Sequence, residues 1–207
     1  MRLPYHQIAG QSLDRLAALS DGIFAVAMTL LVLNLHVPAS GALASEHAVW
    51  DLLVHLSPSL LAYGMSFLTL GIFWIGQQTQ LDRFARSDRW LTWIHLAFLL
   101  AVTLMPFSTG LLAASITSRL ALVVYWLNLL LLGIALLGGL TYAKRAGLIK
   151  EERVTELRYE RYILIAQALY AFAVVLCIIS TYVSIALIIL VQGVFGVAPR
   201  LRWLDRL

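Results

Sequence analysis

Residues 19–33 read LSDGIFAVAMTLLVL, an apolar stretch with a carboxylate near its beginning. At about 100° per residue, a helix would gather its branched apolar side chains on one stripe, with a threonine at the edge: Leu19, Ile23, Val26, Leu30 and Leu33, with Thr29 beside them. Periodicity alone favours packing of this stripe against a neighbouring helix. Asp21 points away from the stripe, and an acid inside a membrane span is costly enough to be a functional candidate.

The composition identifies lipid as the main solvent of this chain. Of its 207 residues, 61% are hydrophobic and 13% are charged, which is about half the charged share of a soluble domain. A soluble fold cannot bury that much apolar surface, so we predict an all-α membrane protein. Disorder, a disulfide scaffold and a nucleic-acid partner are disfavoured, and the single cysteine, Cys177, excludes an intramolecular disulfide.

Intervals without charged residues define the membrane spans. Residues 52–81, 90–118 and 120–143 each fit one helix. The interval 162–199 would form a helix of roughly 57 Å at 1.5 Å per residue, nearly twice a hydrocarbon core of about 30 Å. It therefore predicts two short helices with a tight turn at Ser180–Ser184. One six-helix domain over residues 1–207 results, with approximate spans 13–35, 54–78, 90–113, 119–143, 161–180 and 183–199.

The basic residues orient these spans. With six spans, 14 of the 15 Lys and Arg residues lie on the side of both termini, and only Arg119 lies opposite. Because basic residues concentrate on the cytoplasmic side of membrane proteins, we expect both termini in the cytoplasm. We also expect Pro58, near the start of its span, to be tolerated there. Pro106, deep in the third span, should kink its helix and leave a carbonyl for neighbours to satisfy.

Signatures of enzymatic chemistry are missing from the chain. It has no H-E-x-x-H motif, no G-x-S-x-G elbow, no phosphate-binding loop and no Cys/His cluster at metal spacing. We therefore expect neither an enzyme nor a cofactor. His36, His47 and His55 with Glu46 could form a weak cation site near the outer face, but ordinary interfacial polar residues are the favoured interpretation.

The first predicted helix also carries a motif. Arg15, Leu19, Ser20 and Asp21 closely resemble the first-helix signature R-x-x-x-F-S-D of the endosomal/lysosomal potassium-channel family and its bacterial relatives. Supporting matches are the pair Phe73-Trp74 and the sequence Pro-Phe-Ser-Thr at residues 106–109.

The match has three departures. Leu19 replaces the usual phenylalanine of the signature. Gln77 and Gln78 stand where many relatives have histidines, and His95 stands where an asparagine is common. These differences concern the polar network around the first helix rather than the fold.

The resemblance implies a potassium-permeable channel without a pore loop. Bacterial members have one six-helix unit per chain and assemble as homotetramers in which the first helix lines the pore. The constriction would then comprise Ile23, Val26, Thr29, Leu30 and Leu33. The side chains that connect the first helix to its neighbours would be Arg15, Ser20, Asp21, Trp74 and His95. Potassium ions and the lipid bilayer of the cell membrane are the expected partners.

Two other functions remain open at this point. A secondary transporter could use Asp21 as a proton or sodium relay, although such proteins usually contain inverted repeats and broken helices. A structural or sensory membrane protein without transport is the third hypothesis.

Overall fold

The computed structural model describes residues 12–36, 45–150 and 156–197. The regular secondary structure of these residues is helical, apart from an isolated antiparallel bridge between Phe84 and Ile149. The prediction of an all-α fold is confirmed. The elements are α2 (Leu13–Leu30), η1 (Leu31–Asn34), α3 (Glu46–Leu81), α4 (Arg89–Thr103), α5 (Met105–Ala114), α6 (Arg119–Arg145), α7 (Glu156–Val175), η3 (Leu176–Ile178) and α8 (Thr181–Val197).

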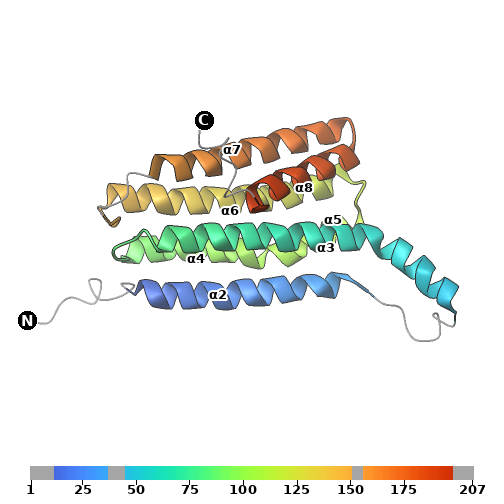
Figure 1. Cartoon of the computed structure of the whole chain (residues 1–207), viewed down its shortest axis with the longest axis horizontal. Coiled ribbons are helices and arrows are strands. Elements are labelled where there is room, and N and C mark those ends of the chain that lie inside the picture. The colour runs from blue at the N-terminus through green and yellow to red at the C-terminus, as the bar shows by residue number, and fades with distance from the viewer. Residues whose placement is uncertain (1–11, 37–44, 151–155, 198–207) are drawn as a thin grey trace, which may run out of the picture.

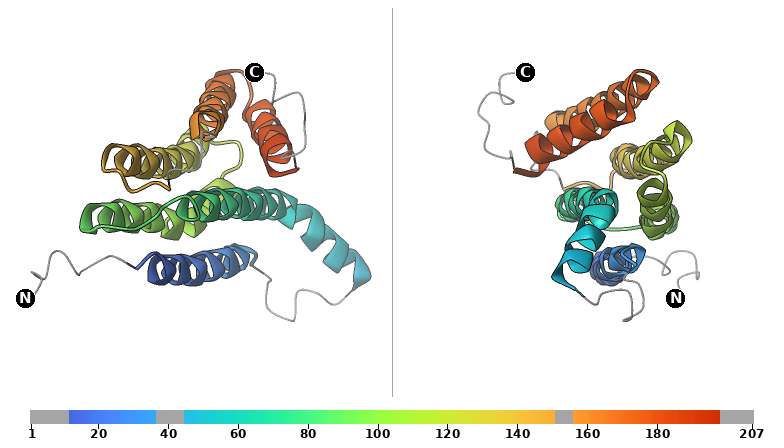
Figure 2. Two further views of the ribbon diagram at one scale, coloured as in Figure 1. Left: turned by 60° about the vertical axis from the view of Figure 1, so that its left-hand side comes forward. Right: turned by 90° about the vertical axis from the view of Figure 1, so that its right-hand side faces the viewer.

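The helices lie side by side along one long axis. Figure 1 shows α2 at one edge, α3 and α4 next to it, and α6, α7 and α8 toward the opposite edge. The two views of Figure 2 show the same order, with α2 and the α7–α8 hairpin on opposite sides of α3. The outermost elements are therefore α2 on one side and the α7–α8 hairpin on the other.

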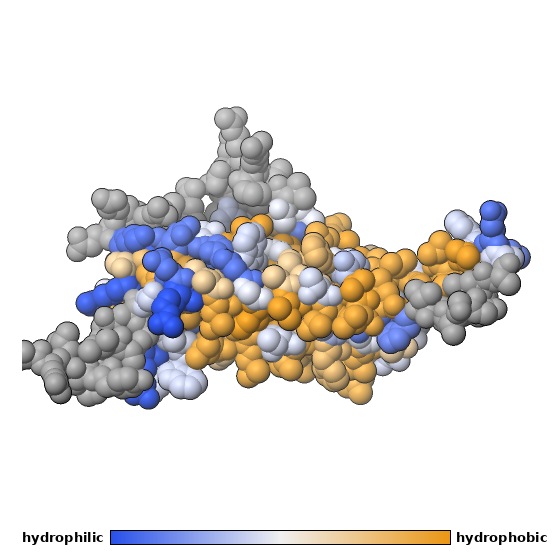
Figure 3. All heavy atoms as spheres, turned by 90° about the horizontal axis from the view of Figure 1, so that it is seen from below, coloured by the Kyte–Doolittle hydropathy of each residue, from blue (hydrophilic) through white to orange (hydrophobic). Residues whose placement is uncertain are grey.

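Five helical segments are long and apolar enough to cross a membrane: Leu13–Asn34, Glu46–Leu81, Arg89–Ala114, Arg119–Arg145 and Glu160–Ile178. The sixth apolar helix, α8, has 17 residues and is therefore about 25 Å long at 1.5 Å per residue. On the face drawn in Figure 3, apolar side chains cover the middle and hydrophilic ones gather toward the ends. This distribution is that of a helical bundle embedded in lipid.

Helix α3 begins earlier than the second predicted span, and this changes the position of Pro58. We expected Pro58 near the start of a helix, but α3 begins at Glu46 and Pro58 lies inside it. Proline has no N–H group, so the carbonyl of Val54 loses its usual partner in the helix. The Ser57 hydroxyl donates a hydrogen bond to that carbonyl, at 2.7 Å. A neighbouring side chain thus makes the proline tolerable, as in other membrane helices.

The third span is broken near Pro106, where a kink was predicted. Helix α4 ends at Thr103 and α5 begins at Met105. With its amide turned to satisfy its neighbours, Asn128 of α6 donates to the carbonyl of Ala101 (3.0 Å) and accepts from the N–H of Met105 (3.1 Å). Those are the two backbone groups that would bond each other in an unbroken helix. Asn128 therefore bridges the break.

Asn128→Leu should destabilise the bundle by about 1–3 kcal/mol, which is the cost of one buried backbone group left without a partner. The full cost of two groups is not expected, because the carbonyl of Ala101 and the N–H of Met105 can partly bond each other once Asn128 is gone. The change keeps the branched shape and the number of side-chain heavy atoms but removes both bonds. Leu127→Ala is the control, since Leu127 is an exposed neighbour on the same helix. The measurement is the free energy of unfolding of the purified protein in detergent. Equal stabilities of the two variants would contradict this role of Asn128.

The turn between the last two helices lies earlier than the sequence suggested. We predicted it at Ser180–Ser184, but α7 ends at Val175, η3 follows, and α8 begins at Thr181. The hydroxyl groups that suggested a turn are bonded at the start of α8. Thr181 donates to the carbonyl of Thr117 at 3.1 Å, and Ser184 donates to the carbonyl of Ser180 at 3.3 Å. Serine can bond the carbonyl four residues earlier in a helix, as Ser184 does, and Thr181 bonds another part of the chain, so these hydroxyls did not distinguish helix from turn.

A buried group of hydroxyls connects the hairpin to the other helices. The hydroxyl of Tyr125, a fully buried residue of α6, lies 3.3 Å from Ser66 Oγ and 3.2 Å from Thr69 Oγ1. Thr109 of α5 donates to Ser66 at 2.7 Å, and Gln192 of α8 donates to Thr69 at 2.6 Å. Four helices are thus connected through polar groups in the interior of the bundle, where lipid offers them no other partner.

Candidate pore-lining site

One face of α2 packs into the bundle. Ser12 caps the helix by accepting a hydrogen bond from the N–H of Arg15. The buried positions then recur at helical spacing: Leu16, Ser20, Phe24 and Ala27, followed by Leu31 in η1. The ring of Phe24 packs against that of Phe98 of α4, with centroids 6.0 Å apart. This face fixes which side of α2 points outward.

The predicted pore residues lie mostly on the other side of α2. Leu19, Val26, Leu30 and Leu33 are exposed by 44, 57, 43 and 65%, and Thr29 is exposed as well. Ile23 differs, because it is partly buried and packs against the core of the same chain. Within the described chain, the stripe is therefore not packed against a neighbouring helix in the way that periodicity alone suggested. It is available to line a pore or to contact another copy.

A shallow groove of about 410 Å³ runs along this stripe. Leu19, Ile23, Val26 and Leu30 form one wall, and Thr103 at the end of α4 contributes to the other. The walls are almost entirely apolar. A surface of this kind repels water and is suited to a hydrophobic constriction.

Asp21 connects α2 to α3. Its Oδ1 atom accepts hydrogen bonds from Trp74 Nε1 at 2.8 Å and from Gln78 Nε2 at 2.7 Å. At about 100° per residue, Asp21 lies on the side of α2 opposite to Leu19 and Leu30. The carboxylate is therefore bound by two donors of the same chain, on the face turned away from the stripe.

A second polar cluster lies beside Asp21 and is buried. Ser20 Oγ lies 2.8 Å from His95 Nε2 of α4, and it donates to the carbonyl of Leu16 at 2.8 Å. Gln77 Nε2 of α3 lies 3.0 Å from Ser20 Oγ and 2.9 Å from His95 Nε2. Three helices thus meet through side chains that share hydrogen bonds. Such bonds between membrane helices contribute to stability because lipid supplies no alternative partner.

Five residues were expected to connect the first helix to its neighbours, and four of them are brought together here: Ser20, Asp21, Trp74 and His95. The fifth, Arg15, is exposed about one turn earlier on α2. From the sequence, Gln77 and Gln78 were identified only as departures from the family pattern. In the structure they bind Ser20 and Asp21 directly. The sequence did contain an indication of this role, because an amide side chain inside an apolar span needs a partner within the protein.

The other end of this helical segment is held by Asn34 of η1, a residue for which the sequence predicted no role. Asn34 Nδ2 donates to the carbonyl of Pro106 in α5 at 3.2 Å. Its amide lies directly over Gly110, where an added Cβ atom would be 2.6 Å from Asn34 Oδ1. Helix α2 and η1 are thus bonded to the rest of the chain near both ends, while the stripe between them stays free.

The weak cation site considered at the outer face is not assembled. His47 Nδ1 lies 3.8 Å from Asp51 on the next turn of α3. Among the described residues, no group of three or more His, Cys, Asp or Glu side chains could hold a metal ion.

Comparison with known proteins relates this site to a family. The model of the family described as endosomal/lysosomal potassium channel TMEM175 matches residues 15–106, which include most of α2, all of α3 and the polar clusters between them. The chain is 33% identical over 144 residues to a potassium channel of Streptomyces collinus, a match covering 68% of each protein. It is 38% identical over 99 residues to a potassium channel of Chamaesiphon minutus, with 48% of each covered.

The fold matches that of a solved relative. The crystal structure of a lysosomal potassium-selective channel TMEM175 homolog from Chamaesiphon minutus superposes with a TM-score of 0.77 and 27% sequence identity. The match covers 89% of this chain and 96% of the other. Together with the similarity to the Streptomyces channel, this shows that the chain belongs to the family of endosomal/lysosomal potassium channels.

Proposed function

We propose that this protein is a potassium-permeable channel whose pore is lined by α2 from four copies of the chain. The observation that carries the proposal is the exposed apolar stripe of α2. Its opposite side is bonded to α3 and α4 through Asp21 and Ser20. Helix α2 and the following η1 are therefore held in place with Val26, Leu30 and Leu33 exposed. Potassium channels among the relatives support the choice of ion.

The apolar stripe suggests how ions are discriminated. Four copies of Leu30 around one axis would form a narrow hydrophobic ring, which gates by losing its water. A permeating ion sheds part of its hydration shell there, and potassium does so at a lower cost than sodium. Thr29 would place hydroxyl oxygens next to the ring. Without a cage of backbone carbonyls, we expect the preference for potassium to be modest.

The same proposal includes the membrane and the topology. The chain would lie in the cell membrane as a homotetramer, with both termini in the cytoplasm because most basic residues lie on that side. It would act by passive conduction, with potassium as the permeant ion, no cofactor and no enzymatic step.

Reconstitution in liposomes tests this function. Potassium inside and sodium outside, at equal concentrations, should give a reversal potential displaced toward the potassium equilibrium potential. Under these conditions a tenfold permeability ratio of potassium over sodium gives a displacement of about 59 mV, and we expect a smaller displacement. Vesicles without protein are the control. No current, or a reversal potential that ignores the potassium gradient, would overturn the proposal.

The same vesicles separate a channel from a secondary transporter. We expect a current that grows in proportion to voltage and does not change when a proton gradient is applied. A transporter relaying protons through Asp21 would show a flux coupled to that gradient. The relatives are channels, and Asp21 already accepts two hydrogen bonds from its own chain, so the comparison and the geometry both favour conduction.

A further inference from the structure

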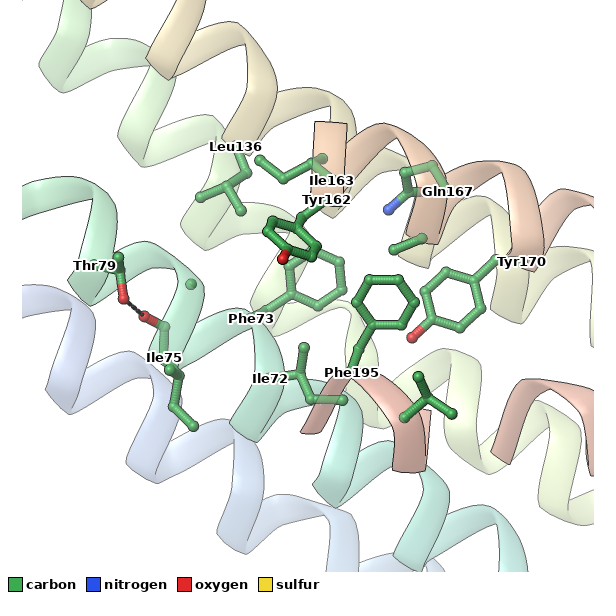
Figure 4. A pocket seen from close by; sticks show the side chains of 13 residues that line it. Ile72, Phe73, Ile75, Thr79, Leu136, Tyr162, Ile163, Gln167, Tyr170 and Phe195 are labelled. Atoms are coloured by element: carbon green, nitrogen blue, oxygen red, sulfur yellow. Dashed lines mark hydrogen bonds between the residues drawn. The ribbon is translucent and has the colours of Figure 1, made fainter. Parts of the chain in front are cut away.

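A second groove lies on the side of α3 that faces away from α2. It is a half-open cavity of about 380 Å³ between α3, α6, α7 and α8. Figure 4 shows Phe73 and Ile72 of α3 on one side and Tyr162, Ile163 and Tyr170 of α7 on the other, with Phe195 of α8 between them. This volume lies within the range of ordinary ligand-binding pockets, about 300–1,000 Å³.

The lining suits a hydrocarbon chain. Most of the wall consists of apolar and aromatic side chains. The polar group of Gln167 is already used in part, since its Nε2 atom donates to the carbonyl of Leu129 at 3.3 Å. Because the surrounding solvent is lipid, an apolar hollow of this size is most favourably filled by an acyl chain.

One end of the groove lies at the basic end of the protein. This end of the groove is lined by Thr79 and Tyr162. Thr79 lies two residues before the end of α3, and Tyr162 lies near the start of α7. The described segments at this end, residues 81–89, 144–150 and 160–161, contain seven basic and three acidic residues. Lys144 is paired with Glu160 at 2.8 Å, whereas Arg161, next to Tyr162, is exposed. This excess of positive charge complements an anionic lipid headgroup.

We propose that this groove binds one acyl chain of an anionic phospholipid, whose headgroup lies against the basic end of the protein. The α7–α8 hairpin and α2 lie on opposite sides of α3 (Figure 2). If α2 faces the pore axis, the groove faces the surrounding bilayer rather than another copy of the chain. A lipid of the adjoining leaflet is therefore the occupant that both the position and the charge favour.

Helix α3 connects this groove to the pore helix. Ile72, Gly76 and Thr79 line the groove. The residues of α3 that contact α2, Trp74, Gln77 and Gln78, lie about 180° around the helix from them at roughly 100° per residue. A lipid that shifts α3 would therefore shift the donors of Asp21 and Ser20. This consequence, and the position of the groove toward the bilayer, rest on the proposed function with α2 at the pore axis, whereas the volume, the lining and the nearby charge of the groove do not.

Lipid retention tests the binding. The protein is incorporated into vesicles of phosphatidylcholine and phosphatidylglycerol at 3:1, extracted in mild detergent, washed and assayed for bound lipid. We expect phosphatidylglycerol to be enriched at least threefold over its bulk fraction. Ala166→Trp, which fills the groove, should abolish the enrichment. Ala168→Trp is the matched control, because Ala168 is on the same helix but exposed outside the groove. Equal retention by both variants, or no preference for the anionic lipid, would overturn the proposal.

A second measurement uses the unmodified protein, so it does not depend on how the variants fold. Phosphatidylglycerol with a photoreactive acyl chain should crosslink mainly to residues of the groove, with Tyr162 and Tyr170 as the expected sites. Crosslinks spread evenly over the exposed apolar residues of α7 would contradict a defined site.

Ion flux tests the connection through α3. Potassium flux of the unmodified protein should differ at least twofold between vesicles with and without phosphatidylglycerol, and the flux of Ala166→Trp should not. Enrichment without any effect on flux would disprove the connection but leave the site intact. Enrichment without flux in any vesicle would instead overturn the proposed function, so the two failures are distinguishable.

Discussion

Leu30→Ala should raise potassium conductance about tenfold, which corresponds to a barrier lowered by about 1.4 kcal/mol. Leu30 is 43% exposed on the free face of α2. In a tetramer, the substitution removes four branched side chains from one level of the proposed constriction. A wider ring stays wet more readily and requires less dehydration of the ion. The discrimination between potassium and sodium should therefore fall, and the reversal potential between opposed gradients should move toward zero.

The matched control for this experiment is Leu164→Ala on α7. Leu164 is a leucine of similar exposure, 54%, in a helix on the far side of the bundle (Figure 1). Its truncation should leave conductance and selectivity unchanged. If Leu30→Ala behaves like Leu164→Ala, Leu30 does not lie at the constriction. Val26→Ala and Ile23→Ala then show whether the constriction lies nearer the N-terminal end of α2. The expected change in conductance is smaller for Ile23, which is partly buried.

The helical fold could be predicted because lipid imposes it. Charge-free intervals identify helices that must satisfy their own backbone, and helix starts carry a local signal as well. Ser12, Asp88 and Ser118 each cap the helix that follows by accepting a backbone hydrogen bond, which is what these residue types do at helix N-termini. Such information is contained in a few neighbouring residues and does not depend on the tertiary structure.

The interruptions of the helices were harder to predict. Pro106 marks the break between α4 and α5, but its partner Asn128 lies 22 residues away on another helix. The turn before α8 could not be placed from Thr181 and Ser184, because the hydroxyl of Ser184 bonds a carbonyl one turn earlier in the chain and that of Thr181 bonds Thr117, in the connection between α5 and α6. These features depend on which helices are neighbours, and local sequence does not contain that information.

The candidate site likewise has some features that the local sequence predicts and others that depend on how the helices pack. The stripe of α2 followed from periodicity, and the family signature identified Ser20 and Asp21. The residues that bind them, Gln77 and Gln78, differ from the family pattern, so resemblance gave no role for them. Gln77 and Gln78 lie about one helical turn after Trp74, so the three side chains share one side of α3. Only the packing of α3 against α2 shows that this side faces α2.

Asp21→Ala should impair folding and assembly more than ion choice. The carboxylate accepts hydrogen bonds from Trp74 and Gln78, and bonds to a charged group contribute about 1.5–3 kcal/mol each. Truncation leaves both donors without an acceptor and removes the contact that orients α2 on α3. Because Asp21 and Trp74 are exposed, water can replace part of these bonds, and we expect the free energy of unfolding to fall by less than their sum, about 2–4 kcal/mol. The yield of the proposed tetramer in size-exclusion chromatography should fall as well. Asp21→Asn, which keeps one acceptor oxygen, should have an intermediate effect.

The control is Asp14→Ala on the same helix. Asp14 is exposed in the first turn of α2, where a carboxylate interacts favourably with the helix dipole by about 0.3–1 kcal/mol. Its loss should therefore cost less than the loss of Asp21, although both substitutions remove one negative charge. If Asp21→Ala instead gives a stable tetramer with altered potassium/sodium discrimination, the carboxylate acts on the permeating ion. Helix α2 would then be rotated relative to the pore axis, with Asp21 rather than Leu30 facing the ions.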